Sequence, residues 1–149
     1  MKENKFETKA IREGYKTSQE QEHSAAIFLT SSFIFDSAEQ AAQRFAKEEQ
    51  GNVYSRFTNP TVETFQDKLA SLEGAESCLA TASGMSAIFA TIMALSKAGD
   101  HIVASRGMFG TTTVLLNTIV NKFGIEVTFV DLPDLVTWKD SIQPNTKLF

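Results

Sequence analysis

The amino-acid sequence is poor in cysteine, proline, tryptophan and histidine, and no apolar stretch in it approaches the ~20 residues needed to cross a bilayer. Its one cysteine, Cys78, cannot form a disulfide within the chain. Cys78 lies inside an apolar run, so we expect a small core residue in a protein of a reducing, cytoplasmic compartment. The N-terminus also lacks the apolar segment of an export signal. Neither export nor membrane insertion is predicted.

Positive charge is scarce as well. The chain has 14 lysines and arginines against 18 aspartates and glutamates, a net charge of -4, and no run of basic residues. This balance offers no electrostatic attraction to nucleic acid or to an anionic membrane, so both partners are excluded. His23 and His101 have no cysteine or carboxylate at ligand spacing, and no metal site is expected.

Two phosphate-binding glycine motifs are missing. No Gly-x-Gly-x-x-Gly follows an expected strand, and no Gly-Lys-Ser/Thr loop occurs. Their absence counts against a dinucleotide or a nucleoside triphosphate, which we keep only as a distant alternative. A smaller phosphorylated cofactor is compatible with the sequence.

What is present is the composition of a soluble globular protein, 42% hydrophobic and 21% charged. In the second half of the chain, strand-like and helix-like apolar patterns alternate. This alternation predicts a parallel sheet with right-handed crossovers, with an apolar helix buried against it. The expected elements are strands 77–82, 101–105, 125–130 and one from about Lys147, and helices 85–97, 111–123 and 134–141.

The first half has a different character. Residues 1–24 are polar and indicate an arm without a core of its own, with a helical turn at 8–12, and residues 25–35 form an apolar segment that we expect to be extended. Two longer helices are expected, one over 37–46 capped by Asp36 or Ser37, and one capped by Asn59, begun by Pro60 and ended by Gly74.

Ligands of such sheets bind at the carboxyl ends of the strands. Three candidate loops lie there, at 83–85, 106–110 and near Asp131. At the first, the helix beginning at Gly84 offers N–H groups without partners and the positive end of its dipole, and glycine has no Cβ to keep an anion away. A phosphate therefore fits this turn, although Ser-Gly turns also occur for backbone reasons alone.

Tyr54 and Arg56 are a second candidate for phosphate binding. In an extended segment they point to the same face, so a phenol and a planar guanidinium can reach one phosphate. For an isolated pair, the alternative is a packed tyrosine beside a solvated arginine.

Three motifs, at residues 54–61, 72–76 and 82–87, agree in order and spacing with the pyridoxal-phosphate (PLP) enzymes of cysteine and methionine metabolism. The sequence resembles this family from about Thr8 to its last residue. The segments at 23–33 and 105–112 are most similar to the sulfhydrylase branch of the family.

The resemblance implies an aspartate-aminotransferase-like α/β fold, that is, PLP-dependent transferase fold type I with a mainly parallel sheet. Residues 1–58 would be an N-terminal arm and inter-subunit segment, and residues 59–149 the first part of the PLP-binding large domain. A homotetramer with active sites shared between subunits is also implied. The residues expected to bind the cofactor are Tyr54, Arg56, Ser83, Gly84, Met85 and Phe109.

Their implied roles differ. The amides of Gly84 and Met85 would hold the cofactor phosphate with help from Ser83, while Tyr54 and Arg56 would reach the cofactor of a neighbouring subunit. Phe109 would stack on the cofactor ring. Most of the family has tyrosine there, so the hydroxyl is missing and acid–base work must fall on another group.

No catalytic residue is expected in this chain. The family's covalently bound lysine and the aspartate beside the cofactor nitrogen would follow Phe149, and Asn145-Thr146-Lys147 resembles the lysine motif only superficially. We therefore expect the N-terminal part of a longer protein, inactive alone and with exposed apolar surface.

The function implied is a PLP-dependent γ-replacement in methionine biosynthesis, in which O-succinylhomoserine and sulfide give homocysteine and succinate. Cystathionine γ-synthase, O-acetylhomoserine sulfhydrylase and γ-lyase activities on the same scaffold are the alternatives. An alternative of another class is a non-catalytic fragment that associates with other subunits and completes their sites.

Overall fold

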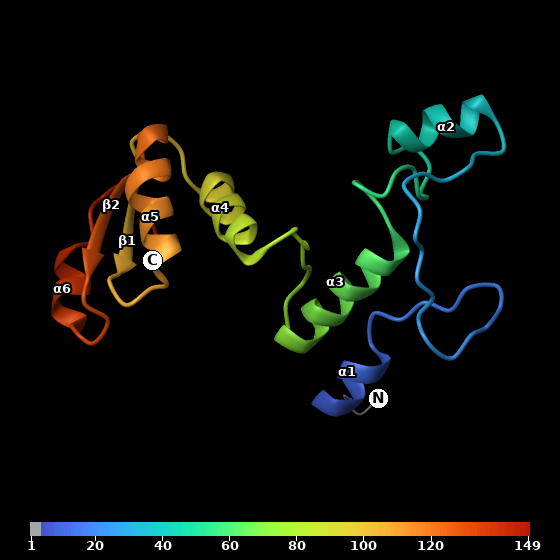
Figure 1. The fold of residues 1–149 in the computed structure, drawn as a ribbon, viewed down its shortest axis with the longest axis horizontal. Coiled ribbons are helices and arrows are strands. Elements are labelled where there is room, and N and C mark those ends of the chain that lie inside the picture. Colours follow the sequence, from blue (N-terminus) through green and yellow to red (C-terminus); the bar gives the residue numbers. More distant parts are fainter. Residues whose placement is uncertain (1–3) are drawn as a thin grey trace. The chain divides into compact units, whose positions relative to one another are not determined.

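The structure is a computed structural model that describes residues 4–149 (Figure 1). The chain divides into two compact units, with the boundary in the sequence between Ala80 and Thr81. We call them the N-terminal unit and the C-terminal unit. Among the described residues, no helix is both long and apolar enough to span a membrane.

The described part of the N-terminal unit contains the helices α1 (Phe6–Arg12), α2 (Ala38–Phe45) and α3 (Pro60–Glu73), coloured blue to green in Figure 1. Side chains begin the two longer helices as predicted. Ser37 accepts a hydrogen bond from the Gln40 N–H at 3.1 Å. Asn59 accepts one from the Thr61 N–H at 2.9 Å. Helix α3 ends at Gly74, whose φ of +64° is left-handed.

The loops of this unit are joined to the start of α3 by side-chain hydrogen bonds. The Asn59 amide group donates to the Phe28 carbonyl at 3.1 Å, and the Phe28 N–H donates to the Thr61 hydroxyl at 2.9 Å. Ser32 and Tyr54 form an isolated antiparallel bridge. These bonds hold the 25–35 segment while leaving Leu29 exposed over 94% of its surface.

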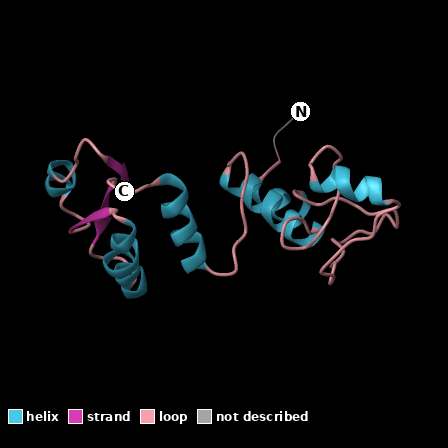
Figure 2. Ribbon diagram, turned by 90° about the horizontal axis from the view of Figure 1, so that it is seen from above, coloured by secondary structure: helices cyan, strands magenta, loops and turns pink. Residues whose placement is uncertain are grey.

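The C-terminal unit has the predicted alternation, and its strands are drawn in magenta in Figure 2. The strands β1 (His101–Ser105), β2 (Glu126–Val130) and β3 (Thr146–Leu148) form a three-stranded parallel sheet in the order β2-β1-β3. The predicted helix 111–123 is a continuous helical segment that passes from α5 through a π-helical turn, η1, to a 3-10 turn, η2. The elements are α4 (Gly84–Leu95), β1 (His101–Ser105), α5 (Gly110–Val114), η1 (Leu115–Ile119), η2 (Val120–Phe123), β2 (Glu126–Val130), α6 (Leu135–Asp140) and β3 (Thr146–Leu148).

The core lies around β1, the central strand. Ile102 and Ala104 pack with buried apolar side chains from α4, η1 and η2 and with Ile125, which directly precedes β2. His101 is fully buried on the same strand, and its two ring nitrogens lie 2.8 Å from the hydroxyls of Thr128 and Thr146. This histidine therefore joins all three strands.

Two predictions about this region are wrong. Residues 77–82 form no strand: no ladder pairs with them among the described residues, and the Ala80 N–H donates to the Gln66 side chain at 2.7 Å instead. Helix α4 is buried against the sheet only at Ile92, and Leu95 is 58% exposed, so most of the predicted burial is absent. Apolar residues surround α4 on every side, and one sheet face can cover only one stripe of them.

Candidate cofactor site

The N-terminus of α4 offers two backbone donors. The Ser83 side chain accepts from the Ser86 N–H at 3.1 Å, and the Ser83 carbonyl accepts from the Ala87 N–H at 3.0 Å. The N–H groups of Gly84 and Met85 have no partner within the described part of the chain. Because they open the helix, they also lie at the positive end of its dipole.

The space in front of these donors is open. A Cβ added to Gly84 would meet no atom within 4 Å, and Ser83 and Gly84 are both exposed. Two amide donors, a hydroxyl and the helix dipole are a donor set that suits a phosphate. The residues present at this turn therefore fit the phosphate of a small cofactor.

Phe109 lies in the same unit, and its ring is exposed to solvent. Its side chain is 77% exposed, directly before α5, and its carbonyl accepts from the Thr112 N–H at 2.9 Å. The buried hydroxyl of Thr112 in turn donates to the Met85 sulfur at 3.8 Å, which connects the first turn of α5 to the first turn of α4. Sequence reasoning missed this link, because a threonine in a helix gives no signal of its own.

An ion pair joins the two loops that follow β1 and β2. Arg106 directly follows β1, and its Nε lies 3.5 Å from an oxygen of Asp131, which directly follows β2. Both side chains are mostly exposed. The sequence predicted these loops as ligand-binding positions but not the pair. The sequence contains a signal for this pair, because residues that directly follow two neighbouring parallel strands lie at the same edge of the sheet.

Tyr54 and Arg56 lie in a turn, so the predicted extended segment is wrong. The N–H groups of Phe57 and Thr58 both donate to the Tyr54 carbonyl, at 2.8 and 3.0 Å. This turn leads the chain into the cap of α3. Even so, the guanidinium carbon of Arg56 lies 5.0 Å from the centre of the Tyr54 ring and 5.5 Å from that of Phe57.

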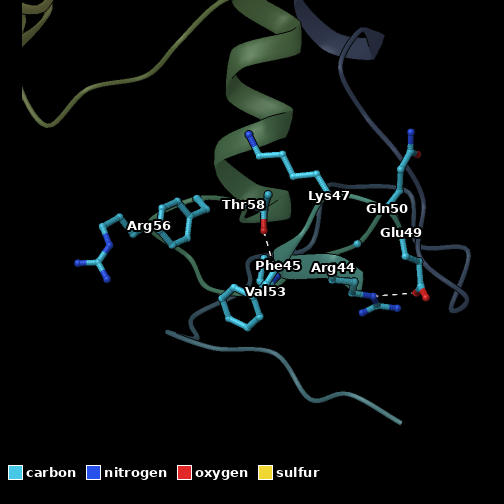
Figure 3. Close-up of a pocket in the computed structure, with 10 residues that line it drawn as sticks. Arg44, Phe45, Lys47, Glu49, Gln50, Val53, Arg56 and Thr58 are labelled. Carbon is cyan, nitrogen blue, oxygen red and sulfur yellow. Dashed lines mark hydrogen bonds and ion pairs between the residues drawn. The ribbon is translucent and has the colours of Figure 1, made fainter. Parts of the chain in front are cut away.

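Arg56 also borders a pocket of about 630 Å³ in the N-terminal unit (Figure 3). On another side of the pocket, Arg44 is bound to Glu49 at 2.9 Å. Figure 3 shows Arg56 directed away from that pair. Arg56 has no ion pair with any residue from 4 to 149, so its charge is available to an outside anion.

The family model for Cys/Met metabolism PLP-dependent enzymes matches residues 7–149. The chain belongs to this family. Its cofactor is therefore PLP, and the fold predicted from the sequence is confirmed. Among residues 4–149, no three side chains of the metal-binding types gather as a metal site.

Three curated relatives of this Cys/Met metabolism family member differ in activity. The chain is 52% identical to O-succinylhomoserine sulfhydrylase of Pseudomonas aeruginosa over 97% of its length, 45% identical to O-acetyl-L-homoserine sulfhydrylase of Corynebacterium glutamicum over 97%, and 42% identical to L-methionine gamma-lyase of Treponema denticola over 96%. It covers 36%, 33% and 36% of these relatives. The chain thus spans about a third of their length.

Solved structures agree with the family assignment. A putative O-acetylhomoserine (thiol)-lyase from Campylobacter jejuni aligns with a TM-score of 0.89 and 34% identity over 99% of this chain and 36% of its own. That structure contains a pyridoxyl-lysine monophosphate. MetB from Corynebacterium glutamicum aligns with a TM-score of 0.86 and 29% identity over 97% of this chain and 36% of its own.

Proposed function

We propose that the protein carrying this chain is a PLP-dependent sulfhydrylase that converts O-succinylhomoserine and sulfide to homocysteine and succinate. The observation that carries this proposal is the 52% identity to the Pseudomonas aeruginosa enzyme, against 42–47% for the relatives whose names give other activities. Phe109 supports it, because phenylalanine at this position resembles the sulfhydrylase branch.

The C-terminal unit supplies the phosphate and ring contacts in this proposal. When bound, PLP provides the electron sink that makes protons on the substrate carbons removable. The amides of Gly84 and Met85 donate to its phosphate, and the Ser83 hydroxyl assists while also capping α4. Phe109 packs against the ring and orients it. Having no hydroxyl, Phe109 holds no proton for transfer.

The N-terminal unit serves a second copy. Tyr54 and Arg56 bind the phosphate held by a neighbouring subunit, which makes a homotetramer with shared sites the proposed assembly. The rings of Tyr54 and Phe57 restrict the Arg56 guanidinium, so less side-chain freedom is lost when it meets the anion. Residues 1–58 act as the arm, residues 59–149 as the start of the cofactor domain, and the cytoplasm is the proposed location.

Cofactor retention tests the shared site. In the complete enzyme loaded with PLP, Arg56→Ala should weaken PLP binding roughly 10- to 100-fold, because a charged hydrogen-bond donor is removed. The measurement is loss of the visible absorbance of lysine-bound PLP during dialysis. Arg44→Ala is the matched control, since Arg44 borders the same pocket but is occupied by Glu49. Equal retention by both variants contradicts the shared site.

Product analysis tests the reaction. We expect homocysteine and succinate from O-succinylhomoserine and sulfide, and a higher kcat/KM than with O-acetylhomoserine. Preference for the acetyl ester would support the second candidate, which the Corynebacterium and Campylobacter relatives favour. Cystathionine from cysteine, or 2-oxobutyrate without sulfide, would identify the synthase or the γ-lyase activity instead.

A non-catalytic role in association is tested by complementation. The 149-residue chain is mixed with a second chain that carries the PLP-binding lysine. If the visible absorbance of lysine-bound PLP appears only in the mixture, the 149-residue chain contributes part of a cofactor site. Binding of ATP or NAD without PLP would favour a nucleotide-binding module and contradict the proposal.

A further inference from the structure

Arg106 is held in place by the sheet itself. Its N–H donates to the Val130 carbonyl at 2.8 Å, which continues the ladder between β1 and β2 by one more bond. The next turn is also fixed, because the Ser105 hydroxyl accepts from the Gly107 N–H at 3.0 Å. The guanidinium therefore projects from a rigid backbone at the edge of the sheet where ligands of parallel α/β folds bind.

The Arg106 guanidinium has hydrogen-bond donors that its ion pair does not use. Its ion pair with Asp131 is made through Nε at 3.5 Å, between side chains that are 65% and 72% exposed. The two terminal NH2 groups have no partner anywhere in the described part of the chain. An exposed pair of this length is weak and exchanges readily, whereas a planar guanidinium binds a carboxylate through two parallel hydrogen bonds.

Arg106 lies three positions before Phe109, the residue proposed to contact the cofactor ring. A ligand carboxylate near that ring thus has one cation in the same loop. The two esters accepted by the family's sulfhydrylases differ at the acyl end, where succinyl carries a carboxylate and acetyl does not.

We propose that Arg106 binds the terminal carboxylate of the succinyl group and selects O-succinylhomoserine over its acetyl analogue, an inference that rests on the proposed function. In the free protein Asp131 holds the guanidinium at the edge of the sheet. The substrate carboxylate then displaces Asp131. Arg106 is a specificity-determining residue and takes no part in proton transfer.

The first experiment compares the two esters in the complete PLP-loaded enzyme. Arg106→Gln should lower the ratio of kcat/KM for the succinyl ester to that for the acetyl ester about tenfold or more. Arg106→Lys should restore part of it, since the charge remains without the planar fork. Lys122→Gln removes an equal charge from η2 in the same unit and should leave the ratio unchanged.

A second experiment measures binding without turnover. The Trp138 indole donates to the Asp131 carbonyl at 3.2 Å, so the part of the complete enzyme's fluorescence that Trp138→Phe removes reports on this edge. Titration with succinate should change the emission, and acetate at equal ionic strength should not. Asp131→Asn should tighten succinate binding by removing the competing carboxylate. Misfolding cannot produce that direction of change.

The outcomes separate this inference from the proposed function. An equal loss of kcat/KM for both esters in Arg106→Gln would overturn the inference. Such a result would mean that Arg106 contacts the homoserine part that both esters share, or that it acts only in folding. An unchanged ratio would overturn it as well. If the wild-type enzyme does not use the succinyl ester with sulfide, the proposed function itself fails.

Discussion

The N-terminal and C-terminal units are held together differently. Among the described residues, all but two of the buried side chains lie in the C-terminal unit, around a three-stranded sheet. From residue 4 to residue 80, only Asn59 and Ala70 are buried. Its segments are joined instead by hydrogen bonds from caps and hydroxyls, such as those that Asn59 makes to Phe28 and Ser55.

The two parts of the proposed cofactor site would therefore be supported differently. In the C-terminal unit, which has its own core, the Thr112–Met85 hydrogen bond joins the first turns of α5 and α4, where the proposed cofactor contacts lie. The N-terminal unit is held by polar links and leaves Leu29 and Ile34 each 94% exposed, and we propose that a second copy covers this surface. The comparison predicts that core substitutions act mainly on the C-terminal unit.

The largest expected effect is Ile125→Ala. Ile125 is 1% exposed, so its truncation should cost about 2–5 kcal/mol in the free energy of unfolding. Phe65→Ala in α3 is the matched change in the N-terminal unit, and it should cost less than about 1 kcal/mol because Phe65 is 56% exposed. Urea unfolding followed by Trp138 and by Tyr15 and Tyr54 emission separates the units. Similar costs would contradict the comparison.

Next in size is a pair of glycine substitutions within the N-terminal unit. Gly14→Ala should cost about 2–4 kcal/mol, because at φ +69° its Cβ would lie 2.5 Å from the Lys68 backbone nitrogen. Gly74→Ala has a similar φ of +64° but open space, so only the backbone strain of about 1 kcal/mol remains. Thermal unfolding measures both. Equal costs would mean that the contact of Gly14 with α3 does not hold this unit.

The sequence predicts the parts whose signals are local. Asn59, Pro60 and Gly74 give the bounds of α3 because caps and breakers act within a few residues. The β1 strand was predicted at 101–105 because a buried strand needs a short apolar run between turns.

The wrong or missing predictions concern features that depend on strand pairing or on contacts between side chains. Apolar pattern in 77–82 indicates burial, while a strand also needs a partner backbone. The turn at Tyr54, the Thr112–Met85 contact and the Arg106–Asp131 pair depend on residues far apart in the sequence or on hydrogen bonds without a sequence signature. The roles of the six predicted cofactor residues stay predictions.

A smaller effect is expected at the cap of α3. Asn59→Ala should cost about 1–2 kcal/mol, because Asn59 is 8% exposed and its side chain bonds Thr61, Phe28 and Ser55. Ser37→Ala at the exposed cap of α2 should cost about 0.5–1 kcal/mol. Chemical denaturation followed by circular dichroism compares the two. If Ser37→Ala costs as much, the loop bonds of Asn59 add nothing to its cap.

The smallest expected effect is a loss of stability in acid that both units share. Hydrogen bonds from Thr137 lower the pKa of Asp134, the cap of α6, and hydrogen bonds from Ser18 lower the pKa of Glu22. A carboxyl group whose pKa is lowered by folding stabilises the folded state at pH values above its pKa in the unfolded chain, about 4. This stabilisation is lost as the pH falls through the pKa of the folded state.

Trp138 on α6 should therefore report local loosening below about pH 4 that Asp134→Asn abolishes, because asparagine caps without titrating. Tyr15, whose hydroxyl donates to the Glu22 carbonyl, should report the corresponding change in the N-terminal unit, and Glu22→Gln should remove it. If acid loosened only the N-terminal unit, its polar links would be weaker than the same kind of link in the C-terminal unit. The contrast between the units would then extend beyond their cores to the hydrogen bonds at their surfaces.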